Sequence, residues 1–412
     1  MKPVTALHVM LQGSRVGELV DIPRKGLYFS FDPSWLLKGF NLAPLHMEFS
    51  SRPQLAADTT LFNGLHGAFS DSLPDGWGLL LMDRFFRRSM AIERHALGPL
   101  DRLAYMGDRG MGALEYVPMF EKDPDQAALD LASLYQASQD VLSGETCEVI
   151  ESLRFAGGSP GGARPKAVIG LSPDKSRAIS SFGEMPDGYE HWLIKFRSQD
   201  EHRDSGAIEQ VYAITARSAG VEISASDLLE VRTPTGIERF FATRRFDRDG
   251  ATRRHMLTAA AILYADFRMP SLDYGDLLRL TFAVTKDASQ VQKMARLMVF
   301  NALAHNRDDH AKNFSFFGAT SGWQMAPAYD LTFSSTSGRG NEHTTAFAGA
   351  GHPTRKVITE VCKPFSFLEP ELYIEQTLDA LSQWNQHCAD FEVDKDQRKS
   401  VLLTLNSVWK DF

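Results

Sequence analysis

The chain has few cysteines and no long hydrophobic run. Its 412 residues include three cysteines, Cys147, Cys362 and Cys388, which lie far apart in the sequence. Such a scattered, odd set gives neither a disulfide framework nor a paired-cysteine metal knuckle, and it is typical of a reducing compartment. No run of about eighteen apolar residues is present, which excludes an obvious membrane-spanning helix.

A signal peptide and an excess of basic residues are also absent. The stretch MKPVTALHVMLQGSRVGE lacks a basic start, an apolar centre and a cleavage site, so we expect a cytoplasmic protein without a membrane partner. With 44 Lys and Arg against 52 Asp and Glu, the net charge is −8, which disfavours a dedicated nucleic-acid-binding protein.

What is present is the composition of a globular protein of more than one unit. Apolar residues make up 43% of the chain and charged residues 23%, and 412 residues exceed the usual size of a single domain. Hydrophobic alternation and turn residues predict an opening antiparallel sheet, and apolar periodicity predicts helices and further strands. The predicted strands are 5–11, 16–21, 27–31, 191–196 and 226–247, with a hairpin over 313–327; the predicted helices are 75–90, 131–142, 207–220, 290–304 and several over 370–411; a mobile loop is predicted over 335–352.

The segment 304-AHNRDDHAKNFSF-316 is the densest group of polar residues that could carry chemistry. One interpretation is a metal-dependent hydrolase with His305, Asp309 and His310 as ligands. The other uses Asp308 and Asn313, whose spacing is that of the D-x-x-x-x-N catalytic loop of protein kinases. In that loop the Asp accepts or orients the proton of the attacking hydroxyl, and the Asn oxygen binds Mg²⁺.

Two neighbouring residues fit the kinase interpretation. Lys312 lies between Asp308 and Asn313 and can face a transferring phosphoryl group. Asp330, in 327-PAYDL-331, follows the predicted hairpin, where kinases keep a second Mg²⁺ ligand.

The middle of the chain offers groups for phosphate binding. The run 157-GGSPGG-162 leaves backbone N–H groups open to approach, and Lys166 follows it. Lys195 interrupts an apolar strand, a position that a lysine rarely occupies without a charged partner. Glu209, at the start of the next helix, is the partner that we expect.

The order of these features is that of a protein kinase: glycine-rich run, strand lysine, helix glutamate, long helix, D-x-x-x-x-N, hairpin and aspartate. We therefore predict an α+β, kinase-like two-lobed fold. Its expected parts are a β-rich N-terminal subdomain with helices (1–120), a part like the kinase N-lobe (121–247) and an all-α C-terminal lobe with the catalytic loop (248–412).

Four stretches resemble the HipA family of bacterial serine/threonine kinase toxins. They are 70-SDSLPDGWG-78, 157-GGSPGGARPKA-167, 244-RRFDR-248, and 306-NRDDHAKNFSF-316 with 327-PAYDL-331. They occur in the order and spacing of that family, and the similarity spans nearly the whole chain.

The resemblance implies a role for each matching residue. Asp308 would be the catalytic base, with Asn313 and Asp330 as Mg²⁺ ligands. The ATP phosphates would be bound by Lys195, and by Lys166 with the backbone of Gly161 and Gly162. Phe246 would stack near the adenine, and Ser159 would be the serine that autophosphorylation uses to silence the enzyme. Arg244 departs from family members with Glu at this hinge, so the adenine contact there would come from the backbone.

The resemblance also implies partners. They are a HipB-like helix-turn-helix antitoxin, DNA reached through that antitoxin, and a protein substrate such as an aminoacyl-tRNA synthetase, by family precedent the glutamyl enzyme. A catalytically weak corepressor acting with the antitoxin is a further alternative. We expect His310 to have a structural role, Asp309 to be a solvated or capping neighbour, and Asp75 to cap a helix in a packing motif outside the site.

Overall fold

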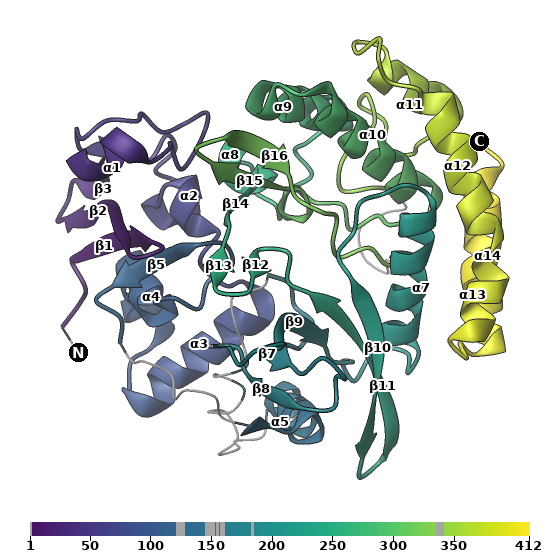
Figure 1. Cartoon of the computed structure of the whole chain (residues 1–412), viewed down its shortest axis with the longest axis horizontal. Coiled ribbons are helices and arrows are strands. Elements are labelled where there is room, and N and C mark those ends of the chain that lie inside the picture. The colour runs from purple at the N-terminus through teal and green to yellow at the C-terminus, as the bar shows by residue number, and fades with distance from the viewer. Residues whose placement is uncertain are drawn as a thin grey trace.

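The computed structural model describes residues 2–120, 128–144, 153, 156, 161–182, 185–334 and 342–412. It opens with a five-stranded antiparallel sheet in the order β4-β3-β2-β1-β5 (Figure 1). Alternating burial along β1 places Leu7, Val9 and Leu11 in the core, as the sequence pattern predicts. The strands are β1 (Ala6–Leu11), β2 (Ser14–Ile22), β3 (Gly26–Phe31), β4 (Gln54–Leu55) and β5 (Leu114–Val117).

Short helices connect this sheet to the rest of the chain. The longest, α3, begins after Asp75 and buries Trp77, Leu81 and Phe86 on one face while Arg87 and Arg88 stay on the other. The elements are α1 (Pro33–Lys38), η1 (Phe62–Gly64), α2 (Gly67–Ser70), α3 (Gly76–Ser89), η2 (Arg94–Ala96) and α4 (Pro99–Met106).

A second, six-stranded sheet carries the middle of the chain, in the order β10-β11-β9-β7-β8-β6. All its pairs are antiparallel, and Lys195 on β9 lies between Lys166 on β7 and Phe241 on β11. Helix α7 packs against β11 and stands between this sheet and the C-terminal helices (Figure 1). The elements are α5 (Leu131–Ser143), β6 (Ala128–Leu129), β7 (Lys166–Leu171), β8 (Ala178–Ser180), β9 (Glu190–Lys195), α7 (Ser205–Ser218), β10 (Ser226–Thr233) and β11 (Gly236–Arg244).

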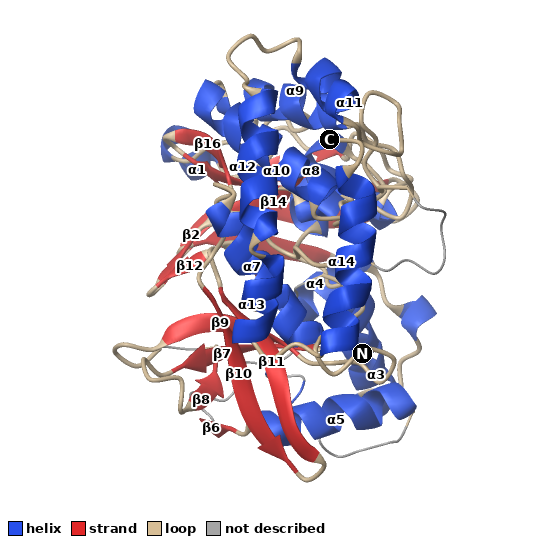
Figure 2. Cartoon of the chain, turned by 90° about the vertical axis from the view of Figure 1, so that its right-hand side faces the viewer, coloured by secondary structure: helices blue, strands red, loops and turns tan. Residues whose placement is uncertain are grey.

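The C-terminal part is mostly helical, but it is not all-α as the sequence analysis predicts. The predicted hairpin forms β15 and β16, and β14 joins them in a three-stranded sheet, with the pair β12–β13 nearby. The strands are β12 (Arg248–Asp249), β13 (Thr252–Arg253), β14 (His255–Thr258), β15 (Ser315–Ala319) and β16 (Gly322–Met325). Figure 2 shows α8, α9, α10 and α11 in the upper part of the view with this small sheet, and the larger sheet in the lower part.

Several of the C-terminal helices, namely α8, α9, α10, α11 and α14, begin at residues whose side chains cap them. In α10 the Asp287 side chain accepts a hydrogen bond from the Ser289 N–H, and eleven residues of the helix are buried. The elements are α8 (Ala259–Leu263), α9 (Tyr274–Thr285), α10 (Ala288–Leu303), η3 (Ala311–Asn313), α11 (Arg355–Cys362), α12 (Pro370–Ser382), α13 (Trp384–Asp390) and α14 (Lys395–Trp409).

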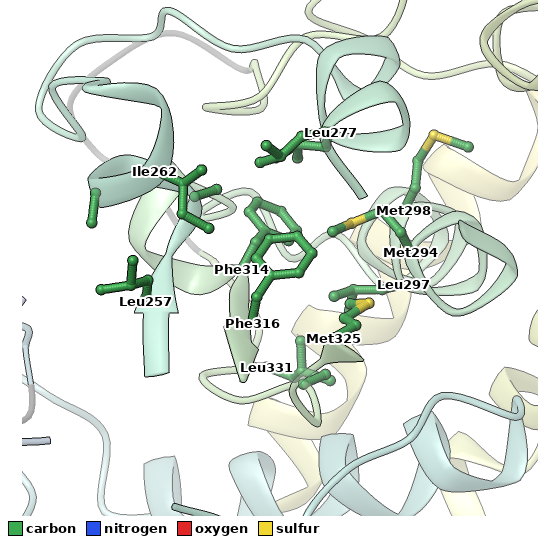
Figure 3. Close-up of a cluster of buried hydrophobic side chains, with 14 of the residues drawn as sticks. Leu257, Ile262, Leu277, Met294, Leu297, Met298, Phe314, Phe316, Met325 and Leu331 are labelled. Atoms are coloured by element: carbon green, nitrogen blue, oxygen red, sulfur yellow. The ribbon is translucent and has the colours of Figure 1, made fainter. Parts of the chain in front are cut away.

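An apolar cluster supports the segment that carries Asp308. Phe314 and Phe316 reach from this segment into a core that includes Leu297 and Met298 of α10 (Figure 3). Leu331, directly after Asp330, packs in the same cluster. The polar residues of 304–313 and Asp330 are therefore held in place by buried side chains that follow them closely in sequence.

Two cysteines, Cys362 and Cys388, are free and buried, whereas Cys147 lies outside the described residues. Among the helices of the described ranges, none is both long enough and apolar enough to cross a bilayer.

Buried histidines give the fold a dependence on pH. His255 on β14 is 3% exposed, its Nε2 lies 2.8 Å from the Leu42 carbonyl oxygen, and burial lowers its pKa to about 4. A histidine in the unfolded chain titrates near ~6.5. Between these values the unfolded state binds a proton that the folded state does not, so stability falls as the pH falls from about 6.5 towards 4.

At pH 5 the lowered pKa of His255 alone is expected to reduce the free energy of unfolding by about 2 kcal/mol relative to neutral pH. Urea unfolding of wild type and His255→Gln at pH 7.5 and pH 5 measures it. The variant should be less stable at pH 7.5, yet should lose less stability on acidification. An equal loss in both proteins would show that His255 does not carry the effect.

Candidate active site

A cleft between the six-stranded sheet and the C-terminal part collects the predicted site residues. Strands β7, β9 and β11 line one side of it. Asp308, His310, Lys312, Asn313 and residues 328–331 line the other, and Asp71, Leu73 and Asp75 of the N-terminal part also contribute. The predicted residues that line it are Gly161, Gly162, Lys166, Lys195, Glu209, Phe246, Asp308, Lys312, Asn313 and Asp330. Ser159 lies outside the described residues.

Two buried lysines lie side by side at the centre of the cleft. Lys166 and Lys195 are direct partners across β7 and β9 and are 4% and 5% exposed. Like charges at opposed positions of a sheet repel, so this arrangement requires anionic partners. The Lys195 ammonium donates hydrogen bonds to the carboxylates of both Glu209 and Asp330. The ion pair between Lys195 and Glu209 is the one that the sequence analysis expects.

These ion pairs shift the pKa values of the central groups. Desolvation opposes the charge on Lys195, but Asp330 and Glu209 outweigh it and raise the Lys195 pKa. Burial likewise opposes ionisation of Asp330, and the charges of Lys195 and Lys166 lower its pKa well below the usual range. Lys166, by contrast, has a lowered pKa because desolvation dominates. The cleft therefore holds an ionised carboxylate at Asp330 beside the charged ammonium of Lys195.

Arg164 is a member of this network that the sequence analysis missed. Its Nη1 donates to Glu209 Oε2 at 2.8 Å, and its Nε donates to the Phe196 carbonyl oxygen at 3.0 Å. Glu209 thus receives Lys195 on one oxygen and Arg164 on the other. A signal was present in the sequence, since Arg164 lies two residues before Lys166 at the end of the glycine-rich run.

Asp308 and Asn313 come together in one tight loop. Asn313 Nδ2 donates to the Asp308 carbonyl oxygen at 2.6 Å, and the Asp308 N–H donates to Ser334 Oγ at 3.2 Å. These bonds fix the backbone, and the Asp308 side chain, which lines the cleft, is 67% exposed. Partial desolvation, with Asp330 and Asp309 nearby, raises the pKa of Asp308 despite the opposing charge of His310. Asp308 can therefore meet the hydroxyl of another molecule.

Asp309 is not the solvated neighbour that the sequence analysis predicts. Its side chain is fully buried and accepts hydrogen bonds from the Tyr274 hydroxyl at 2.7 Å and from the Thr344 and Thr345 N–H groups at 2.9 and 3.1 Å. His343 Nδ1 lies 2.9 Å from the same carboxylate. These contacts also anchor residues 343–345, so this part of the predicted mobile loop is held against the catalytic segment, whereas 335–341 lie outside the described residues.

The three residues of the metal-hydrolase interpretation diverge. His305 stacks against Phe333 with ring centroids 5.4 Å apart, and burial lowers its pKa to about 4. His310 packs against Phe267 at 5.6 Å, and Asp309 is directed towards Tyr274 and His343. Within the ranges that the structure describes, no three His, Cys, Asp or Glu side chains are grouped to hold a metal ion.

Asp75 stands in the cleft, contrary to the prediction that its motif lies outside the site. It precedes α3, but its side chain makes no capping bond to that helix. One carboxylate oxygen accepts the Gly162 N–H, and the other accepts Lys312 Nζ at 2.7 Å. The position of Asp75 before a helix predicted a cap. The contact with Lys312 could not be predicted, because it joins residues 237 positions apart and leaves no local pattern in the sequence.

Part of the lining of the cleft is apolar. Val168, Leu193, Met256 and Leu331 line it together with Phe246, whose ring lies 5.5 Å from that of Tyr329. Arg244 also lines it, but the Arg244 N–H donates to the Ala225 carbonyl and its side chain pairs with Glu190.

Known protein families match both the N-terminal and the C-terminal part of the chain. A family model described as HipA N-terminal domain matches residues 7–117, and one described as HipA-like C-terminal domain matches residues 158–402. A solved structure titled as the Shewanella oneidensis MR-1 toxin–antitoxin system HipA, HipB and operator DNA complex contains a chain with a similar fold. The match has a TM-score of 0.69 and 18% identity and covers 98% of this chain and 95% of that one. The Helicobacter pylori proinflammatory kinase CtkA matches 52% of this chain and 92% of its own, with 12% identity and a TM-score of 0.31.

Proposed function

Because the chain belongs to the HipA family, we propose that it is an ATP-dependent serine/threonine protein kinase and the toxin of a toxin–antitoxin pair. The observation that carries this proposal is the Lys195 ammonium shared by Glu209 and Asp330 in the cleft that also holds Asp308. Phosphoryl transfer needs positioning and charge neutralisation more than covalent chemistry, and this cleft offers both.

The residues of the cleft fit ATP. The buried ammonium groups of Lys166 and Lys195 are suited to the phosphates, and the apolar residues of the lining are suited to adenine. Gly162 has a φ of +99°, a left-handed conformation that favours glycine, so no side chain covers the main chain there. Such a cradle lets phosphate oxygens approach the main chain.

The same residues fit a divalent cation bound with the nucleotide. Asp330 and the side-chain oxygen of Asn313 would hold it, since Asn313 uses its nitrogen for the Asp308 carbonyl. Mg²⁺, when bound, would neutralise part of the phosphate charge. Asp308 would accept the proton of the attacking serine or threonine hydroxyl, and its exposed carboxylate can reach a hydroxyl on another protein. Lys312 would neutralise charge on the transferring phosphoryl group.

The proposed partners follow from the family and from the Shewanella complex, which contains HipB and operator DNA. We propose a HipB-like helix-turn-helix antitoxin, with DNA reached through it, and a cytoplasmic substrate, the glutamyl-tRNA synthetase being the first to test. Autophosphorylation of Ser159 would silence the enzyme.

The test is a transfer assay with labelled Mg-ATP, the purified chain and glutamyl-tRNA synthetase, followed by phosphosite mapping. The expected result is phosphoserine or phosphothreonine on the synthetase, and phosphate on Ser159 that is absent from Ser159→Ala. Transfer to another translation component would correct the substrate alone. No transfer to any protein would favour the corepressor alternative.

A further inference from the structure

The start of α3 contacts the end of the glycine-rich run along its main chain. The Trp77 N–H donates to the Gly162 carbonyl at 3.0 Å, and Trp77 Nε1 donates to the Lys166 carbonyl at 3.2 Å. Gly76 has a φ of +43°, and a Cβ there would lie 2.5 Å from the Gly162 oxygen. The two segments are therefore held at a separation that only glycine permits at position 76.

The Asp75 carboxylate extends this contact to the catalytic loop. It accepts the Gly162 N–H on one oxygen and Lys312 Nζ on the other, and the Lys312 and Asp75 side chains are 18% and 13% exposed. We call this set of contacts the Asp75 bridge. It joins three segments that are distant in sequence: the start of α3, the glycine-rich run and the loop after Asp308.

The donors of the Asp75 bridge are groups of the kind that bind phosphate. A backbone N–H on a glycine-rich run and a lysine ammonium both bind phosphate oxygens readily. A carboxylate resembles a phosphate edge, since it presents two acceptor oxygens and negative charge. The charge of Lys312 lowers the Asp75 pKa in spite of burial, so Asp75 stays ionised at neutral pH.

Of the other carboxylates that line the cleft, Asp71 accepts hydrogen bonds from the Thr258 N–H and hydroxyl, and the rest have roles in the proposed reaction. Asp75 has no role there beyond the bridge. Asp330 is the proposed cation ligand, and Glu209 holds Lys195 together with Arg164. Asp75 lines the same cleft and would face the nucleotide phosphates with a like charge.

We propose that Asp75 is a positioning residue that holds the Gly162 N–H and the Lys312 ammonium in the nucleotide-free protein and gives them up to the phosphates. This inference rests on the proposed nucleotide-binding function. The bridge keeps both donors in place when the cleft is free of nucleotide, and its carboxylate competes with the phosphates for them.

The first test compares the affinity of ADP without metal for wild type, Asp75→Asn and Asp83→Asn. Asp83 lies on the same helix and pairs with Arg102 at 2.8 Å, and it does not line the cleft, so its variant is the matched control. Asp75→Asn should bind ADP roughly tenfold more tightly, the scale of one partly screened unit charge, while Asp83→Asn should bind as wild type does. Equal or weaker binding by Asp75→Asn would overturn the inference.

The second test needs no nucleotide. Amide hydrogen exchange of a peptide covering 161–167 should be several-fold faster in Asp75→Ala than in wild type or Asp83→Asn, because the Gly162 N–H loses its acceptor. Unchanged exchange would contradict the bridge even if no variant binds ADP. If wild type binds neither ADP nor Mg-ATP while exchange responds as expected, the proposed function fails and the bridge remains.

Discussion

Replacing Asp308 by asparagine is expected to lower the rate of phosphoryl transfer by about 10²–10⁴-fold, the usual contribution of a general base. The amide keeps the size of the side chain and cannot accept the proton of the attacking hydroxyl. Because the pKa of Asp308 is raised, wild-type activity should decline towards acid pH at a higher pH than an unperturbed aspartate would give. Initial rates at saturating Mg-ATP, measured across pH, give both results.

The stability of Asp308→Asn should stay within about 0.5 kcal/mol of wild type, because its side chain is 67% exposed. A variant that transfers phosphate at a near wild-type rate would remove Asp308 from the proposed role. A variant that is inactive because it unfolds would contradict the assignment as well. Urea unfolding distinguishes such a variant from one that is folded but lacks the base.

Replacing the next residue, Asp309, by asparagine is expected to destabilise the fold by about 3 kcal/mol or more. The carboxylate accepts hydrogen bonds from two backbone N–H groups and a buried tyrosine, and an amide cannot accept all of them. Each buried donor left without an acceptor costs roughly 1–3 kcal/mol. The midpoint of urea unfolding measures the change, with Asp308→Asn as the matched control.

An Asp309→Asn protein as stable as wild type would show that the network around Tyr274 and His343 does not hold the loop. The two neighbouring aspartates thus make opposite predictions, one for rate and one for stability. A loss of activity in one variant alone could come from lost catalysis or from lost stability. Measuring rate and stability in both variants separates the two causes.

The elements could be predicted from the sequence where the signal is local. Alternation marks β1 to β3, and the apolar stretch 290–304 marks α10, so the structure confirms both. The third strand of the small sheet, β14, is four residues long and fully buried, which gives no alternation to detect. The all-α prediction for the C-terminal lobe was wrong, because the hairpin predicted over 313–327 lies in this lobe and β14 extends it into a sheet.

In the candidate site, too, some features could be predicted from local sequence and others depend on distant contacts. Spacing alone brought Asp308 and Asn313 into one loop, and a lysine in an apolar strand pointed to its ion pair with Glu209. The burial of Asp309 depends on contacts with residues 34 to 36 positions away, and the place of Asp75 on a contact with Lys312 far along the chain. Side-chain direction at such positions is fixed by tertiary packing and not by local pattern.

The central claim is that this cleft binds Mg-ATP and transfers its terminal phosphate to a protein hydroxyl. Intact-mass spectrometry of the phosphatase-treated chain, before and after incubation with Mg-ATP, tests it most directly. The account predicts the added mass of one phosphate in wild type and no added mass in Asp308→Asn. An unchanged mass in wild type, or the same added phosphate in both proteins, would contradict it.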